Sequence, residues 1–142
     1  MTFCSLEQWM MWRKAILFGD YEIAEQIMKI DSSNKQAQTL IKKLGRQVRG
    51  FREKVWVAER EKNVEVGLYN KFKQNVSLRD QLLATDDSLL VEASPYDRIW
   101  GIGFNAVDAE RVPQSEWGLN LLGKLLMKVR DRLRLEKPQA SA

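Results

Sequence analysis

Apolar side chains recur at helical spacing near the end of the chain, and this pattern constrains the fold more than any other feature of the sequence. Because residues three and four apart share one face of an α-helix, the pattern predicts a helix that begins at Ser115 and buries one face in a core. The stripe consists of Leu121, Leu122, Leu125, Leu126, Val129 and Leu133. We therefore expect a fold built mostly from amphipathic helices.

Helix-boundary signals divide the rest of the chain. Ser5 and Gln8 form a capping box, Gly19 is placed to end the first helix, and Asp20 can cap the second. The expected earlier helices span residues 5–18, 20–30, 35–44, 52–74 and 78–83, and residues 89–93 have the apolar composition of a short strand. The predicted fold class is mainly α: a single compact multihelical domain with a few short strands.

Length and composition favour one domain. The 142 residues suffice for a single core, and we expect a domain over residues 1–136 followed by a disordered tail over residues 137–142. No apolar run approaches the roughly 20 residues that a membrane span needs. The first residues also lack the pattern of a signal peptide. The sequence therefore predicts a cytoplasmic protein that does not contact a membrane.

The inventory of side chains excludes several classes of chemistry. The chain contains no histidine and a single cysteine, Cys4. Ser-His and Cys-His nucleophile pairs, HExxH zinc sites, internal disulfides and multi-cysteine zinc sites are therefore excluded. Catalysis would have to rest on Asp, Glu, Lys, Arg, Tyr or the backbone, which favours carboxylate-driven hydrolysis or simple binding. We expect no metal and no cofactor.

The net charge of +4 is the balance of 23 basic and 19 acidic side chains, and many of the basic residues fall in two clusters. Such clusters suit a phosphate-bearing partner, but the interspersed acidic residues favour a solvated helix face over nucleic-acid binding. The clusters comprise Lys42, Lys43, Arg46, Arg49, Arg52 and Lys54, and then Lys124, Lys128, Arg130, Arg132 and Arg134.

Glu7 is a candidate catalytic residue. It falls in the first turn of the first predicted helix, where the helix dipole favours an ionised carboxylate. Such a carboxylate can stabilise a cationic sugar or orient a water molecule, although it can equally do no more than complement the dipole. Lys14 lies about two turns further on the same face, so the two side chains could line one side of a pocket or be unrelated surface charges.

The segment around Asp97 and Trp100 is a candidate ligand loop. An indole can stack on a heterocyclic base, and a neighbouring carboxylate can hydrogen-bond the base edge or the ribose. Gly101 and Gly103 would let a backbone approach a ligand closely. The alternative is a core tryptophan beside a turn-forming aspartate.

Arg46 and Asn120 complete the candidate binding residues. Arg46 follows Gly45, the expected helix stop, and could reach a phosphate or merely complement the helix dipole. Trp117, Asn120 and Lys124 would share a stripe of the last helix. Gly123, a poor helix former, indicates that something packs closely there, and another helix is the favoured neighbour.

These segments together resemble the NADAR family (NAD- and ADP-ribose-associated). The resemblance runs from about Thr2 to Arg134 and is carried by pieces in the family's order. They are Glu7-Gln-Trp-Met with Lys14-Ala15, Leu44-Gly-Arg46, Leu82-Leu-Ala-Thr85, Leu90-Val-Glu-Ala93, Asp97-Arg-Ile-Trp-Gly101 and Asn120-Leu-Leu-Gly-Lys124.

The resemblance implies a pocket for a ribosylated, phosphorylated heterocycle. It implies catalytic roles for Glu7 and Asp97. It also implies substrate binding by Lys14, Arg46, Trp100 and Asn120. Two departures stand out: Ile102 replaces a carboxylate found in some members, and the chain begins without a segment of about twenty or more residues that members usually have before this point.

Three functions follow as hypotheses. The first is an N-glycosidase that acts on a riboflavin-pathway intermediate or an ADP-ribosylated base. The second is a non-catalytic module that binds ADP-ribose or a related nucleotide. The third and least favoured is a helical protein whose basic last helix binds nucleic acid or an acidic partner.

Overall fold

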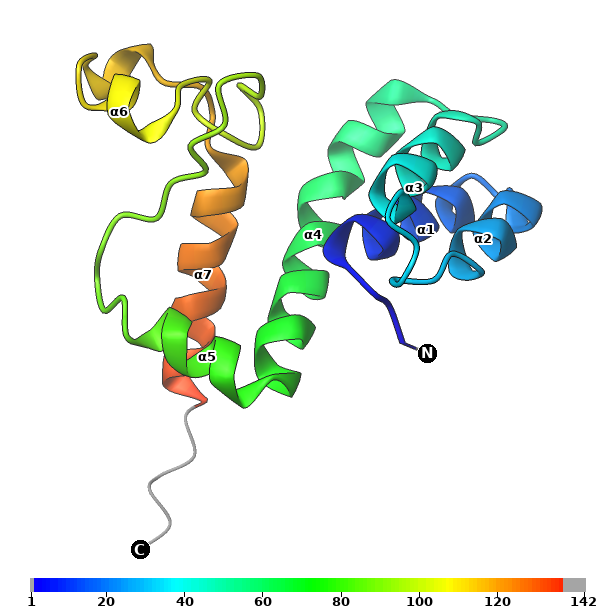
Figure 1. The fold of residues 1–142 in the computed structure, drawn as a ribbon, viewed down its shortest axis with the longest axis horizontal. Helices are drawn as coiled ribbons and strands as arrows, with labels where there is room; N and C mark the ends of the chain where they lie inside the picture. Colours follow the sequence, from blue (N-terminus) through cyan, green and yellow to red (C-terminus); the bar gives the residue numbers. More distant parts are fainter. Residues whose placement is uncertain (1, 137–142) are drawn as a thin grey trace, which may run out of the picture. The chain divides into compact units, whose positions relative to one another are not determined.

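The computed structural model describes residues 2–136, and the predicted tail over residues 137–142 lies outside them. Helices account for all the regular structure in this part, so the mainly α class is confirmed while the predicted short strands are wrong. The chain divides into two compact units, Met1–Gly67 and Leu68–Ala142. Figure 1 shows α1 (Leu6–Leu17), α2 (Tyr21–Met28), α3 (Ala37–Arg46), α4 (Glu53–Gln74), α5 (Val76–Leu83), α6 (Ala106–Ala109) and α7 (Leu121–Leu135), to which the short 3-10 helix η1 (Gln114–Glu116) is added.

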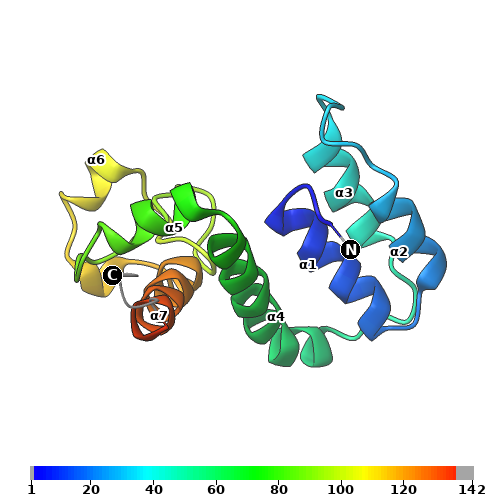
Figure 2. The same cartoon turned by 90° about the horizontal axis from the view of Figure 1, so that it is seen from below.

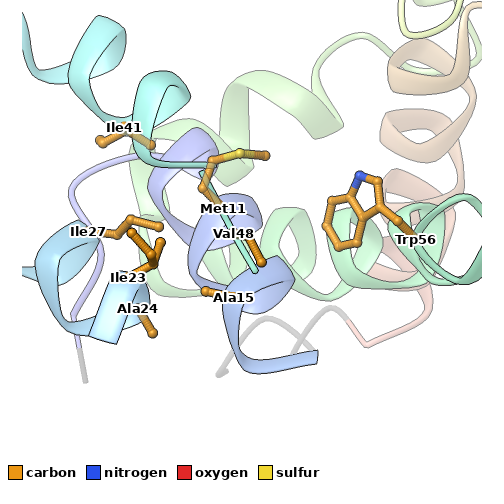
Figure 3. Packing of buried hydrophobic residues seen from close by; sticks show 8 residues of the cluster. All are labelled: Met11, Ala15, Ile23, Ala24, Ile27, Ile41, Val48 and Trp56. Atoms are coloured by element: carbon orange, nitrogen blue, oxygen red, sulfur yellow. The ribbon is translucent and has the colours of Figure 1, made fainter. Parts of the chain in front are cut away.

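In the first unit, α1, α2 and α3 pack against one another (Figures 1 and 2). The predicted caps are confirmed: Ser5 Oγ accepts from the Gln8 amide at 3.0 Å, and Asp20 Oδ1 accepts from the Ile23 amide at 3.2 Å. The buried Gln8 side chain also donates to the Ile27 carbonyl at 3.0 Å, which links α1 to α2. The side chains of Figure 3 form the core: Met11, Ala15, Ile23, Ala24, Ile27, Ile41, Val48 and Trp56.

Gly45 sets the distance between α1 and α3. A Cβ atom at this position would overlap the Met11 side chain, so the missing side chain lets the two helices touch. Gly45 therefore lies inside α3, and the prediction that it ends the helix is wrong. Arg46 occupies the last helical turn as a result.

The connection after α3 is held by Asp20, whose side chain is buried. Its Oδ2 accepts from the Arg49 amide at 2.8 Å, and its Oδ1 accepts from Arg49 Nη2 at 3.0 Å. These bonds lower the pKa of Asp20 to about 2. Gly50 then turns the chain with φ of 76°, which glycine adopts without strain.

In the second unit, α5 packs against α7. The predicted leucine stripe is confirmed, because Leu125, Val129 and Leu133 are buried and Leu121, Leu122 and Leu126 are half-buried. The short helix α5 is capped by Asn75, whose Oδ1 accepts from the Leu78 amide at 3.1 Å.

The predicted strand over residues 89–93 is an extended segment beside α7 (Figure 1). Its backbone is bonded by one side chain: Asn120 Oδ1 accepts from the Glu92 amide at 2.9 Å, and Asn120 Nδ2 donates to the Leu90 carbonyl at 3.0 Å. The Ile102 amide also donates to the Glu92 carbonyl at 3.0 Å, but these bonds do not extend into a strand ladder within the described residues.

The start of α7 also differs from the prediction. The helix begins at Leu121 and not at Ser115, because Asn120 has φ of 53° and breaks the helical path. The preceding residues bond instead to the loop at residues 98–102, with the Gly118 amide 2.8 Å from the Ile102 carbonyl and the Leu119 amide 2.8 Å from the Arg98 carbonyl. We call this pairing of residues 98–102 with residues 118–122 the clasp.

None of the helices within residues 2–136 is long and apolar enough to cross a membrane.

Candidate functional site

Glu7 lies half-buried in the first turn of α1. Burial raises the pKa of its carboxyl, while the positive charges of Lys42 and Lys14 act in the opposite direction. The two lysines therefore support an ionised carboxylate in a place where water alone would not solvate it fully.

Lys14 lies in the last turn of α1. Burial lowers the pKa of its ammonium, the Arg46 charge lowers it further, and the Glu7 carboxylate raises it. At the contact between α1 and α3, the charges of Lys14 and Lys42 thus act on Glu7, and the charge of Arg46 acts on Lys14. We name Glu7, Lys14, Lys42 and Arg46 the α1–α3 charge cluster.

Two residues of this region were missed as site candidates. Lys42 was assigned only to a basic stretch, although its spacing of four from Arg46 places both on one face of α3. Phe51 was not considered: its ring centroid lies 4.4 Å from Lys14 Nζ. The signal in the sequence was that Phe51 is an aromatic residue directly after Gly50. Its contact with Lys14 depends on the fold and could not be predicted from the sequence.

Asp97 and Trp100 belong to the second unit. Asp97 Oδ1 accepts from the Ile99 amide at 2.9 Å and from the Trp100 amide at 2.8 Å, so the aspartate shapes its own turn. Trp100 is half-buried. A Cβ at Gly101 would lie 2.8 Å from the Glu92 carbonyl oxygen, so this glycine accommodates the chain's own backbone.

Asn120 is buried at the first residue before α7, where both ends of its amide bond the extended segment. The expected stripe of Trp117, Asn120 and Lys124 does not form, because only Lys124 lies within the helix. The close packing expected at Gly123 is confirmed, but the neighbour is the Leu90 carbonyl and not another helix. Ile102 is fully buried.

The six predicted site residues therefore fall into two sets. Glu7, Lys14 and Arg46 lie on α1 and α3 of the first unit, where their charges influence one another. Asp97, Trp100 and Asn120 meet in the second unit, where the clasp joins the Trp100 carbonyl to the Leu122 amide at 3.1 Å. Within residues 2–136, no group of three or more acidic, cysteine or histidine side chains is placed to hold a metal ion.

The basic face of α7 is engaged largely within the chain. Arg130 Nη1 donates to Thr85 Oγ1 and to the Ser88 carbonyl, both at 2.9 Å. Arg134 pairs with Asp87 at 3.0 Å. Arg130 and Arg134 of the last helix are therefore engaged by groups of the chain itself.

Comparison with known families identifies the family of the chain. The family model of the NADAR domain matches residues 1–134, which include every residue of both sets. The chain belongs to the NADAR family.

Similar NADAR proteins include named N-glycosidases. The chain is 45% identical to N-glycosidase R617 of Acanthamoeba polyphaga mimivirus, over 91% of this chain and 74% of that protein. It is 32% identical to N-glycosidase YbiA of Escherichia coli (strain K12), over 84% of this chain and 66% of that protein. It is also 38% identical to Protein irg-1 of Caenorhabditis elegans, over 94% of this chain and 62% of that protein. The chain thus spans 62% to 74% of the length of these relatives.

Proposed function

We propose that the chain is an N-glycosidase that hydrolyses the bond between ribose C1′ and a heterocycle nitrogen. The proposed substrate is a phosphorylated, nucleoside-like small molecule, either a riboflavin-pathway intermediate or an ADP-ribosylated base. Membership of the NADAR family and the names of its relatives support a glycosidase function. A cytoplasmic location stays a prediction.

The observation that carries the proposal is the α1–α3 charge cluster. When the C1′–N bond breaks, its electron pair leaves with the heterocycle and positive charge develops on the sugar. Ionised Glu7 would stabilise that charge or orient the water that attacks C1′. The water oxygen then bonds to C1′, and one of its protons passes to the departing nitrogen or to solvent.

The cations of the cluster would bind the substrate. Arg46 offers a planar guanidinium fork and Lys14 an ammonium, which are the groups that bind phosphate in proteins. In the second unit, we propose that Asp97 assists the reaction, Trp100 stacks on the base and Asn120 hydrogen-bonds the sugar. For Asp97 and Asn120 these roles would add to the backbone hydrogen bonds they already make.

The test is release of free base. We would incubate the purified protein with ribosylamino-pyrimidine phosphates, NAD, ADP-ribose and ADP-ribosylated guanosine, and detect the products by mass spectrometry. Glu7→Gln should lower the rate about 100-fold or more, because it removes the charge that stabilises the transition state. The matched control is Glu53→Gln, since Glu53 is an exposed carboxylate in the first turn of α4.

The pH dependence gives a second readout. Because burial raises the pKa of Glu7, activity that needs its carboxylate should fall with decreasing pH at values above the ordinary 4.5. Full turnover by Glu7→Gln would contradict the proposed role of this residue.

A non-catalytic module that binds ADP-ribose or a related nucleotide is the second candidate. Ile102 favours it, because this position holds a fully buried apolar side chain where some family members have a carboxylate. Calorimetry that detects nucleotide affinity while the ligand remains intact would support this candidate over the enzyme.

A further inference from the structure

Phe51 lies on the short connection between α3 and α4, beside the end of α1. Its ring meets the Phe18 ring edge-on, with the centroids 5.4 Å apart. The Lys14 ammonium lies over the Phe51 ring at 4.4 Å from its centroid. With 41% of the residue exposed, Phe51 is a large aromatic group at the edge of the α1–α3 charge cluster and outside the core.

The position of this ring is determined by the residues before it. Asp20 binds both the backbone and the guanidinium of Arg49. Gly50 then redirects the chain with φ of 76°, a backbone conformation that residues with side chains rarely adopt. Asp20, the N-cap of α2, therefore helps to determine the position of Phe51 through its hydrogen bonds to Arg49.

The surroundings of Lys14 explain why such a ring matters. A lysine side chain has four rotatable bonds, and ordering it costs about 2 kcal/mol in conformational entropy. The neighbouring Arg46 charge opposes the ammonium, whereas Glu7 and the negative face of an aromatic ring favour it.

We propose that Phe51 is a positioning residue for Lys14, which holds the ammonium in place for an anionic, phosphate-bearing ligand before the ligand arrives. Affinity is gained because the lysine is ordered in advance and not at the moment of binding. The inference rests on the role of Lys14 in the proposed function and adds a residue that acts through it.

The first test needs no ligand. The Lys14 Cε–Hε signals in an NMR spectrum, assigned with Lys14→Arg, should be shifted upfield by the ring current of Phe51. Phe51→Leu should abolish this shift, whereas Phe51→Trp should keep or increase it. Phe18→Leu is the matched control. It removes the ring that contacts Phe51 from the edge but keeps the Phe51 ring itself, so the upfield shift of the Lys14 signals should remain.

The second test is calorimetry with ribose 5-phosphate as the probe. Phe51→Leu should weaken its affinity by roughly 3- to 10-fold, in keeping with the loss of one cation–π contact, while Phe51→Trp should bind like the unsubstituted protein. Normal affinity in Phe51→Leu, or a Lys14 signal without an upfield shift in the unsubstituted protein, would overturn the inference.

The proposed function and this inference fail in different ways. If Lys14→Gln binds the probe as well as the unsubstituted protein, the phosphate-binding role of Lys14 is wrong and the inference falls with it. If base release depends on Glu7 but the Lys14 NMR signals are the same in Phe51→Leu as in the unsubstituted protein, the enzyme proposal stands and the inference is overturned. If Phe51→Leu does not fold, Phe51→Trp decides: an upfield shift that is kept or increased supports the inference, and a lost shift overturns it.

Discussion

Two carboxylates of the first unit differ in what their surroundings do to them. Asp20 is buried among hydrogen-bond donors, and its pKa is lowered to about 2, chiefly by the Arg49 side chain. Glu7 is half-buried, and burial is the largest influence on its pKa, which is raised. A carboxylate that is satisfied by its own fold stabilises structure, whereas one that remains costly to ionise is suited to act on a ligand.

Acid unfolding should report the role of Asp20. Because its pKa is lowered when the protein folds, it contributes stability above about pH 4, and this contribution is lost as the pH falls towards 2. Asp20→Asn keeps the cap of α2 but loses the charge, and should lower the free energy of unfolding by about 1 kcal/mol at pH 6. Urea denaturation at several pH values would measure this.

The difference between Asp20→Asn and the unsubstituted protein should shrink towards pH 2. Glu22→Gln is the control, because Glu22 bonds the same guanidinium at 3.1 Å but is exposed. Its effect should stay within about 0.5 kcal/mol. A pH-independent effect of Asp20→Asn would show that the charge is not what matters.

At the scale of elements, the contact between α7 and the extended segment at residues 89–93 organises the second unit. Asn120 bonds two backbone groups of the segment. Gly123 lies one turn later and lets the Leu90 carbonyl approach the helix. The helix and the segment therefore depend on each other for their close packing.

Gly123→Ala should destabilise the protein even though alanine favours helices by about 1 kcal/mol. The added methyl group would overlap the Leu90 carbonyl oxygen, and we expect a net loss of about 1 to 3 kcal/mol. Thermal unfolding followed by circular dichroism would measure it. Lys124→Ala is the control at the next, exposed position, and a variant Gly123→Ala at least as stable as the control would contradict the packing argument.

The sequence predicted those elements whose causes are local. Ser5 and Asp20 cap helices through residues three positions away, and the leucine stripe of α7 needs only its own spacing. The strand and the start of α7 were mispredicted because they depend on the clasp and on Asn120, which join distant parts of the chain. Likewise, the spacing of Glu7 and Lys14 on one helix could be predicted, whereas Lys42 and Phe51 required the packing of other segments on α1.

At the scale of the whole molecule, the two compact units carry different parts of the predicted site. The contacts that define the α1–α3 charge cluster lie within the first unit. The hydrogen bonds of Asn120 and the clasp lie within the second. A substitution in one set of residues should therefore lower the local stability of its own unit first.

Hydrogen exchange followed by mass spectrometry would test this division. Asn120→Ala should speed exchange in peptides from residues 89–136, because it removes an acceptor from the Glu92 amide. Peptides from α1, α2 and α3 should keep their rates. Asp20→Asn should do the reverse, with faster exchange in peptides of the first unit and unchanged rates in residues 89–136. Faster exchange throughout the chain in both variants would contradict the division into separately stabilised units.

The clasp has a practical consequence for protein engineering. The Gly118 amide donates to the Ile102 carbonyl, so residues 103–117 form a loop whose two ends are held together by this hydrogen bond. Lengthening a loop that is already closed costs little, because the entropy of closure grows only with the logarithm of its length. This excursion, with Val107 well exposed on it, is therefore the place to insert an affinity tag or attach a fluorophore while Trp100 and Asn120 stay where they are.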